Sequence, residues 1–339
     1  ATDLEVISHG SPASFEGGLP FNKRFTPGHE YMGTIVAVGP TVDEYAVGER
    51  IAVEIHAGCG RCERCRQGMY TSCLNYGRNY GEFDKGHRAN GFTTDGGFAQ
   101  YAVNHINTLV RVPDALSDEL ATLIVTAGTA TYGLDVLGGL VAGQSLVVTG
   151  AGPIGLMVVA VAKALGAAPV ILTDIRDDRL AIGMRMGADV VINASQVPAV
   201  DAVRAANGGR GVDYVFECSG APNAVNDAVR MVSRGGRVCL GAFSHQSAVV
   251  DIGYIVANNI YLYGIRGEGK SAVRRAASLM AQRKIDASPV HTHTFALDEL
   301  PTGLRYARDR IDGAIKVVIK PQVVRGGTVD KPVHAFAES

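Results

Sequence analysis

The sequence predicts an α/β fold with a parallel sheet, joined to a smaller β-rich domain. Residues 1 to about 110 are rich in glycine and turn signals and contain short β-like runs such as "GTIVAVG". From Ser145 onward, apolar runs of strand length alternate with helical stretches, as expected of a parallel sheet flanked by helices. A chain of 339 residues with 47% hydrophobic content can bury a large core and divide into two domains.

Composition narrows the range of partners and compartments. A formal net charge of −1 gives no electrostatic footprint for nucleic acid or a membrane surface, so small-molecule partners are favoured. The apolar run 154–162 ends at Lys163 and is too short to span a membrane. The amino terminus lacks the pattern of a secretory signal, so we expect a cytoplasmic protein whose thiols stay reduced.

The β-rich part contains four closely spaced cysteines in "CGRCERCRQGMYTSC", residues 59–73. The spacing CxxCxxCx7C lets short turns bring four thiolates to the corners of a tetrahedron, as structural zinc requires. Unrelated free cysteines and an iron–sulfur cluster are the alternatives. A zinc with four protein ligands has no position for a substrate, so this metal is expected to fix a loop and to perform no catalysis. The predicted ligands are Cys59, Cys62, Cys65 and Cys73.

The α/β part begins with the glycine motif "GAGPIG", which follows a Val-rich strand and precedes a helical run. This arrangement is typical of dinucleotide binding. Gly150 permits the tight turn, Gly152 lets the backbone approach a pyrophosphate, and Gly155 allows the helix to pack closely on the strand. Pro153 and Ile154 complete the predicted cofactor-binding loop.

The second strand of this unit ends at Asp174, 24 residues after Gly150. An acid at this position accepts hydrogen bonds from the ribose hydroxyls and repels a 2′-phosphate, which favours NAD over NADP. Arg176 and Arg179 support the opposite preference, because a guanidinium group there can bind a phosphate. We expect NAD, with Asp174 and Arg179 at the cofactor.

The order of four motifs along the chain resembles the zinc-containing alcohol dehydrogenases of the medium-chain dehydrogenase/reductase superfamily. The motifs are "FTPGHEYMGTIVAVG", the cysteine loop, "GGFAQY", and "GAGPIG" with its acid. The polyol, sorbitol and threonine dehydrogenase branch looks nearest. The resemblance implies a GroES-like catalytic domain from residues 1–127 and 266–339, the latter including a carboxyl-terminal extension, with a Rossmann NAD-binding domain inserted at 128–265.

The resemblance also implies roles for individual residues of this chain. His29 resembles the catalytic zinc ligand, and Glu30 the neighbouring acid that completes the zinc shell in polyol-type members. Thr2 resembles the hydroxyl that takes the substrate's proton, and Asp3 the acid that orients the histidine. Lys316 looks like the basic residue that reaches the cofactor pyrophosphate.

The sequence departs from the family pattern in two places. The first catalytic zinc ligand of the family is a cysteine that would stand immediately before Ala1, so we expect an amino-terminal segment to be missing from this chain. Many relatives carry a cysteine or acid where this chain has Thr126, a poor zinc ligand, so Glu30 is expected to serve. His29 and Glu30 can bind one metal only if the backbone is irregular, since neighbouring strand residues point to opposite faces, and Gly28 favours irregularity.

The implied activity is hydride transfer from a secondary alcohol or polyol to NAD, which gives a ketone or aldehyde. Two zinc ions per chain are expected, one structural and one that binds the alcohol oxygen and lowers its pKa. The alternatives are a non-catalytic NAD-binding relative with the structural zinc alone, and a zinc-free reductase. A homodimer or homotetramer is expected, with the apolar run 258–265 as the pairing edge strand.

Three further segments give weaker predictions. His291 and His293 alternate along a strand but offer only two ligands, so we interpret them as structural. The loop 76–97 is a candidate specificity loop because it carries polar side chains suited to hydroxyl-rich substrates, Arg78, Tyr80, Arg88 and Asn90. The tail 321–339 is expected to be a surface extension.

Overall fold

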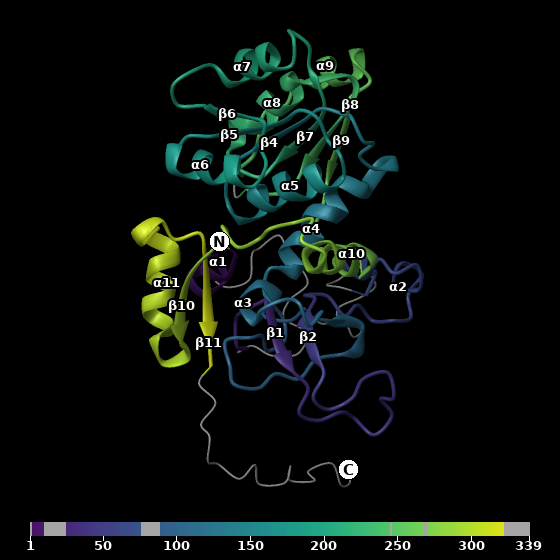
Figure 1. Cartoon of the computed structure of the whole chain (residues 1–339). Coiled ribbons are helices and arrows are strands. Elements are labelled where there is room, and N and C mark those ends of the chain that lie inside the picture. Colours follow the sequence, from purple (N-terminus) through teal and green to yellow (C-terminus); the bar gives the residue numbers. More distant parts are fainter. Residues whose placement is uncertain (1, 10–24, 76–88, 245, 268–269, 322–339) are drawn as a thin grey trace.

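The structure is a computed structural model that describes residues 2–9, 25–75, 89–244, 246–267 and 270–321 (Figure 1). A six-stranded sheet forms one half of the molecule, and a β-rich half lies beside it. The β-rich half contains a three-stranded and a two-stranded sheet. This arrangement confirms the predicted α/β class.

The six-stranded sheet is parallel throughout and has the order β6-β5-β4-β7-β8-β9. The order reverses between β4 and β7. In doubly wound sheets a dinucleotide binds in the crevice at such a reversal, so we expect the cofactor at the carboxyl ends of these strands. The predicted run 258–265 contains an edge strand, because β9 lies at the end of the sheet, and its role in pairing two chains stays a prediction. The strands are β4 (Leu146–Thr149), β5 (Val170–Asp174), β6 (Val190–Asn193), β7 (Val212–Glu217), β8 (Val232–Leu240) and β9 (Tyr261–Gly264).

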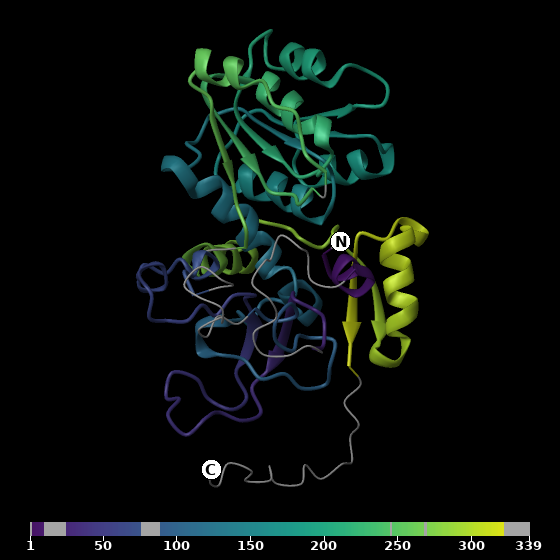
Figure 2. The same cartoon turned by 180° about the vertical axis from the view of Figure 1, so that it is seen from behind.

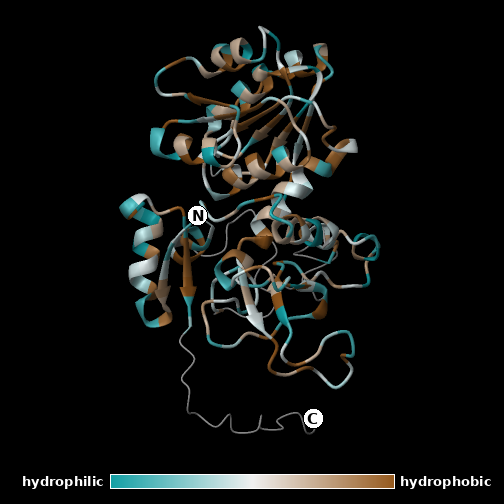
Figure 3. Ribbon diagram, in the orientation of Figure 1, coloured by the Kyte–Doolittle hydropathy of each residue, from teal (hydrophilic) through white to brown (hydrophobic). Residues whose placement is uncertain are grey.

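Helices cover both faces of this sheet, so its strands are buried on both sides and read as continuous apolar runs. Figure 3 shows the strands in brown, as expected of such a core. Eight consecutive residues of α5, from Gly155 to Ala162, are buried, because this helix packs against the sheet centre. The covering helices are α5 (Pro153–Ala164), α6 (Asp177–Arg185), α7 (Ala199–Ala206), α8 (Pro222–Met231) and α9 (Ile252–Ala257).

The β-rich half is built from both ends of the described chain. Strands β1 (Tyr31–Thr34), β2 (Arg50–Val53) and β3 (Leu109–Arg111) form an antiparallel sheet. Strands β10 (His291–Ala296) and β11 (Lys316–Lys320) form a parallel pair, and helix α11 (Leu300–Asp309) packs on it. Helix α1 (Thr2–His9) lies beside this pair in both views (Figures 1 and 2). The remaining short elements are α2 (Glu63–Arg66), α3 (Asp118–Ala121), η1 (Tyr70–Ser72), η2 (Ile106–Thr108), η3 (Val136–Gly138), η4 (Leu297–Glu299) and η5 (Ile311–Gly313).

Two helices join the halves. Helices α4 (Ile124–Asp135) and α10 (Lys270–Ala281) pack against each other between the six-stranded sheet and the three-stranded sheet (Figure 1; seen from behind in Figure 2). Their contact requires glycine at position 128, since a β-carbon there would lie 2.4 Å from Cγ2 of Val273. The six strands lie inside the predicted insertion 128–265. The boundaries of that insertion stay a prediction.

Among the described residues, one helical run, Asp118–Gly138, is long and apolar enough to cross a membrane by length and composition. This run is not the apolar run 154–162 that the sequence singled out. Of its most apolar window, 61% is buried inside the protein, which is typical of a core helix. The predicted cytoplasmic location stays a prediction.

Candidate functional site

The four-cysteine loop has the geometry of a metal site. One ligand atom from each cysteine lies within 4.8 Å of all the others. The Sγ atoms of Cys59 and Cys65 are 3.9 Å apart, close to the roughly 3.8 Å edge of a tetrahedron with Zn–S bonds of about 2.3 Å. The sulfur of Cys59 accepts a hydrogen bond from the backbone of Cys62, and that of Cys62 accepts one from Cys65. All four thiols are free of disulfides.

The electrostatics of this loop differ from thiol to thiol: hydrogen bonds lower the pKa of Cys59 and Cys62 towards the thiolate form that metals bind, whereas burial raises the pKa of Cys65 and Cys73. Burial by itself raises the pKa of Cys59, but hydrogen bonds from the backbone of Arg61 and the amide of Asn75 outweigh it and lower that pKa to about 6. Glycine at position 58 is needed, since its φ is +61° and a β-carbon would lie 2.7 Å from the Cys65 sulfur. The donor set and spacing therefore fit the predicted structural zinc.

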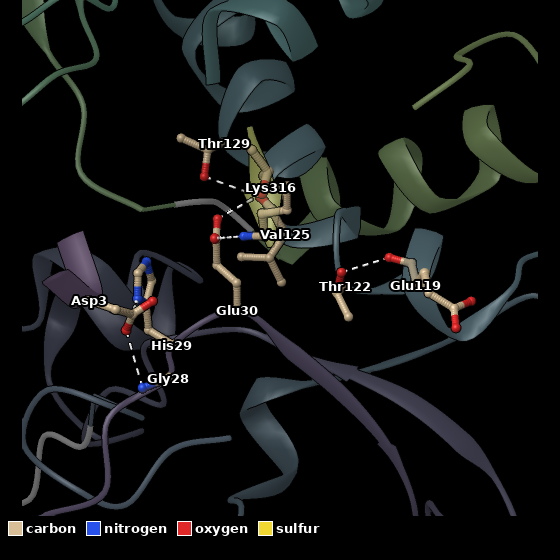
Figure 4. A network of polar contacts seen from close by, with 10 residues as sticks. Asp3, Gly28, His29, Glu30, Glu119, Thr122, Val125, Thr129 and Lys316 are labelled. Carbon is tan, nitrogen blue, oxygen red and sulfur yellow. Dashed lines mark hydrogen bonds and ion pairs between the residues drawn. The ribbon is translucent and has the colours of Figure 1, made fainter. Parts of the chain in front are cut away.

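The second site is a buried network around His29 and Glu30 (Figure 4). His29 is 8% exposed, and its Nδ1 lies 2.7 Å from Oδ1 of Asp3, which comes from helix α1. The backbone N–H of Gly28 donates to the same carboxylate oxygen at 3.1 Å. Gly28 has a φ of +98°, so the backbone is irregular immediately before His29, as predicted. Because Asp3 holds Nδ1, the other ring nitrogen, Nε2, is left as a ligand atom.

Glu30 is held at both carboxylate oxygens. The hydroxyl of Thr126, on helix α4, donates to Oε1 at 2.7 Å. The ammonium group of Lys316, at the start of β11, contacts Oε2. Asp3, His29, Glu30, Thr126 and Lys316 thus form one network from four separate segments of the chain, and Thr126 meets Glu30 directly.

The charges in this network stabilise one another. Burial raises the pKa of Glu30, but Lys316, His29 and the Thr126 hydroxyl outweigh that effect and hold it well below its usual value. Burial lowers the pKa of His29, yet the ion pair and hydrogen bond with Asp3 raise it above the usual 6.5. The pKa of Asp3 is lowered by the same pair despite the opposing effect of burial. The network therefore favours an ionised Glu30.

The donor chemistry of this network fits a zinc ion. An imidazole nitrogen oriented by a carboxylate and a neighbouring ionised carboxylate are both zinc ligands. Within the described ranges, the four-cysteine cluster is the one group of three or more metal-binding side chains that lie close together, so His29 and Glu30 contribute a partial set. Thr2 opens helix α1, one residue before Asp3. The roles of Thr2, His29, Glu30 and Lys316 in catalysis stay predictions.

The glycine loop after β4 has the shape that a pyrophosphate needs. Gly150 has a φ of +91°, and a β-carbon on Gly155 would lie 1.9 Å from the Gly150 carbonyl oxygen. A β-carbon on Gly152 would meet nothing within 4 Å, so open space lies in front of the loop. Gly152 caps helix α5, whose first residues are Pro153 and Ile154. The helix N-terminus therefore faces the space where an anion binds.

Asp174 lies at the end of β5, next to this loop. Its carboxylate accepts hydrogen bonds from the backbone of Ala151 at 2.6 Å and of Arg176 at 2.9 Å. The guanidinium of Arg176 pairs with Asp178. Arg179 is 6% exposed, and its Nη2 donates to the carbonyl oxygen of Ala314 at 2.5 Å. Both arginines thus have protein partners, which leaves the acid as the feature that faces the loop.

Other predictions are resolved as follows. His291 Nε2 lies 2.9 Å from the Thr294 hydroxyl, and His293 packs against Phe295 and Tyr306, so both act as structural side chains. Residues 76–88 and 322–339 lie outside the described residues, and with them most of the candidate specificity loop and the tail. Asn90 is buried and donates from Nδ2 to the Glu54 carbonyl, so it holds the loop base and does not face a substrate.

Reasoning from the sequence missed two contacts in this region. Lys316 and Glu30 are 286 residues apart, and no spacing rule predicts that they pair. Arg179 and Ala314 are 135 residues apart and link the cofactor side to the start of β11. A charged residue within an otherwise apolar strand-length run, as in "AIKVVI", is the one local signal that points to a buried partner.

Comparisons with known proteins agree with the geometry. Residues 1–114 match the alcohol dehydrogenase GroES-like domain, and residues 153–282 match the zinc-binding dehydrogenase domain. L-threonine 3-dehydrogenase from Pectobacterium atrosepticum is 32% identical over 288 residues, which is 85% of this chain and 76% of that protein. The enzyme of the same name from Pyrococcus horikoshii is 36% identical over 270 residues, 79% of this chain and 74% of that protein.

Solved structures show the same relationship. A zinc-binding dehydrogenase from Sinorhizobium meliloti 1021, bound to NADP, has a TM-score of 0.82 at 27% identity, covering 94% of this chain and 88% of that chain. The 2R,3R-butanediol dehydrogenase from Bacillus subtilis has a TM-score of 0.78 at 26% identity, covering 92% of this chain and 87% of that chain. This chain therefore belongs to the zinc-containing alcohol dehydrogenases of the medium-chain dehydrogenase/reductase superfamily, and it is a zinc- and nicotinamide-dependent alcohol or polyol dehydrogenase.

Proposed function

We propose that this chain oxidises a secondary alcohol whose neighbouring carbon carries an amino or hydroxyl group. NAD is the hydride acceptor, and His29 and Glu30 are ligands of the catalytic zinc. The observation that carries the proposal is the buried network in which Asp3 orients His29 while Thr126 and Lys316 hold Glu30. Such a network keeps both ligand groups in place before metal and substrate bind, which is what a catalytic centre requires.

Each residue of the network has a chemical task. When bound, zinc acts as a Lewis acid that makes an alcohol oxygen more acidic. Nε2 of His29 and the carboxylate of Glu30 would hold it, and Asp3 fixes the tautomer and direction of the imidazole. The hydroxyl of Thr2, next to Asp3, would accept the proton that the substrate releases and pass its own proton outward to solvent. If Glu30 held the metal in place of its contact with Lys316, the ammonium group of Lys316 would be available to a cofactor phosphate.

The cofactor preference follows from Asp174. Its carboxylate lies against the glycine loop, where the ribose hydroxyls of the adenosine half are held. A 2′-phosphate would meet this negative charge, and Arg176 and Arg179 are already engaged by Asp178 and Ala314. NAD is therefore the preferred cofactor.

The substrate class follows from the relatives. L-Threonine carries its secondary alcohol next to an amino-bearing carbon, and 2,3-butanediol carries one next to a second hydroxyl, and enzymes named for both are similar to this chain. A secondary alcohol with an amino or hydroxyl group on the neighbouring carbon is the feature that they share. We assign that feature to the substrate of this chain.

Formation of NADH tests the proposal directly. The protein is supplied with zinc and with NAD or NADP, and absorbance is followed with L-threonine, 2,3-butanediol, sorbitol and 2-butanol. The expected result is NADH formation with threonine, a vicinal diol or a polyol, little with 2-butanol, and slower formation of NADPH. Reduction of activated enones in place of alcohol oxidation would contradict the proposal, since that is the chemistry of a zinc-free reductase.

Assembly through the edge of the large sheet is a further part of the proposal. Strand β9 lies at the sheet edge, and Tyr261 on it is 53% exposed. An exposed edge strand offers unpaired backbone groups to a second copy, and a two-fold axis satisfies both chains equally. Light scattering coupled to size exclusion is expected to give the mass of a dimer or tetramer, and replacement of Leu262 by proline is expected to reduce it.

A further inference from the structure

The buried carboxylate of Glu217 lies at the reversal point of the large sheet, and no role described so far uses it. Glu217 is the last residue of β7 and is 1% exposed. Four donors meet at its Oε1 atom. They are the backbone N–H of Ser219 at 2.7 Å, that of Gly220 at 3.1 Å, the Thr149 hydroxyl at 3.4 Å and the Ser219 hydroxyl.

These donors come from both sides of the cofactor crevice. Thr149 ends β4 directly before the glycine loop, whereas Ser219 and Gly220 follow β7. A buried carboxylate is costly unless it is hydrogen-bonded, and all four donors meet a single oxygen, Oε1. Hydrogen bonds to a charged acceptor are about twice as strong as neutral ones. Glu217 therefore fixes the turn at 218–220 to the end of β4.

The turn at 218–220 is closely packed on two sides. A β-carbon on Gly150 would lie 2.9 Å from the Ser219 Cα, so the glycine loop packs directly on the turn. On the other side, a β-carbon on Gly220 would lie 2.8 Å from the carbonyl oxygen of Phe243, in the segment after β8. The turn thus separates the pyrophosphate loop from the β8 end of the crevice.

The two halves of a doubly wound sheet each hold one mononucleotide. The half made of β4, β5 and β6 contains Asp174 and takes the adenosine half. The other half of the sheet consists of β7, β8 and β9, and the 218–220 turn directly follows β7. We expect this half of the sheet to bind the nicotinamide mononucleotide of the cofactor. We propose that Glu217 is a positioning residue that fixes the 218–220 turn as the wall against which the nicotinamide half of NAD is held.

This inference rests on the proposed use of NAD. A binding experiment tests the use of NAD and the role of Glu217 separately. Calorimetry is performed with NAD and with ADP, which carries the adenosine and both phosphates but lacks the nicotinamide half. For the wild-type protein, failure to bind NAD would contradict the proposed function itself. If NAD binds, the role of Glu217 is tested by comparing the ratio of the NAD and ADP dissociation constants between the wild-type protein and its variants.

Two variants probe the carboxylate. Glu217→Gln keeps the shape but removes the charge, and it is expected to weaken NAD binding by about tenfold while ADP binding changes less than about twofold. Ser219→Ala removes one donor from an exposed residue, is well tolerated, and is expected to weaken NAD binding by about threefold. The second variant keeps the test decisive if the first one fails to fold.

Asp213→Asn is the matched control. Asp213 lies at the other end of β7, where its Oδ2 accepts from the backbone and hydroxyl of Ser145 and so joins β7 to the residue before β4. This variant also replaces an acid by its amide, and Asp213 also connects β7 to the β4 side of the sheet, but it lies at the opposite end of β7 from Glu217. The NAD-to-ADP ratio is expected to stay at the wild-type value. Equal weakening of NAD and ADP in Glu217→Gln, or no weakening of either, would overturn the assignment.

Discussion

The hydroxyl of Thr126 donates a 2.7 Å hydrogen bond to Oε1 of Glu30, 96 positions away in the sequence. A threonine hydroxyl is a poor zinc ligand, and here it contacts Glu30, the proposed ligand. The relationship leads to the first prediction, which concerns this hydrogen bond alone.

Thr126→Val is expected to lower kcat/KM by about fivefold and to weaken catalytic zinc binding by a similar factor, because Glu30 loses a donor worth about 1 kcal/mol. Zinc titration and steady-state kinetics measure both effects. Thr131→Val is the control, since its hydroxyl on the same helix donates to the Ala127 carbonyl, away from Glu30. If both Thr126→Val and Thr131→Val bind zinc with the wild-type affinity, Thr126 does not support Glu30 as a ligand.

Asp3→Asn is expected to weaken catalytic zinc binding by about 10- to 100-fold, because the carboxylate that fixes the imidazole of His29 is replaced by a neutral amide. The affinity is measured by competition with a chromogenic chelator, after the structural site has been saturated. Asp43→Asn, at an exposed position, is expected to bind zinc as the wild type does. Equal affinities for Asp3→Asn and Asp43→Asn would exclude this role for Asp3.

Lys316→Met is expected to destabilise the metal-free protein at pH 7 by about 2 kcal/mol, less than for a fully buried ion pair, because Glu30 is left without its cation. The paired Glu30 has a lowered pKa, so its contribution to stability is present above its usual value of 4.5 and is lost as the pH falls. The difference between wild type and variant therefore shrinks below about pH 4.5. Urea unfolding across this pH range measures it.

Lys320→Met provides the matched control on the same strand. Lys320 pairs with Glu119 at 3.1 Å at an exposed position, where such a pair contributes about 0.5 kcal/mol or less. A stability difference for Lys316→Met that is as small as that of Lys320→Met, or that does not change with pH, would show that the Glu30 pair is not formed in the metal-free protein.

Two glycines of the cofactor loop are expected to respond differently to alanine. Gly152→Ala adds a methyl group where nothing lies within 4 Å, so the melting temperature is retained while NAD binding weakens by about 100-fold, because the methyl fills the pyrophosphate space. Gly155→Ala places a β-carbon 1.9 Å from the Gly150 carbonyl, so the fold itself is destabilised. Thermal melts and NAD titration distinguish the two. Full NAD affinity in Gly152→Ala would contradict the assignment of this space.

The fold and the metal loop could be predicted because their signals are local. Strands such as β4 and β5 are buried on both faces and therefore appear as continuous apolar runs, and the glycine loop and Asp174 follow from their place in one βαβ unit. The four cysteines lie within fifteen positions, so their spacing alone indicates a common centre.

The contacts that complete the catalytic network could not be predicted because they join distant segments. Lys316 meets Glu30 only because β11 packs beside the segment that leads into β1, and Glu217 acquires its four donors only because β7 lies next to β4. The sequence pattern favours Asn90 as a substrate contact, yet its amide donates to the Glu54 carbonyl, since a buried polar group must find a partner wherever the fold places it.

The zinc content of the purified protein, expressed from its complete natural reading frame, tests the central claim most directly. Plasma mass spectrometry is expected to give two zinc ions per chain, and one per chain after replacement of His29 by alanine. One ion is expected at Cys59, Cys62, Cys65 and Cys73, and the other at His29 and Glu30. A single zinc per chain that persists unchanged in His29→Ala would leave the cysteine loop as the sole metal site and would contradict zinc-dependent catalysis.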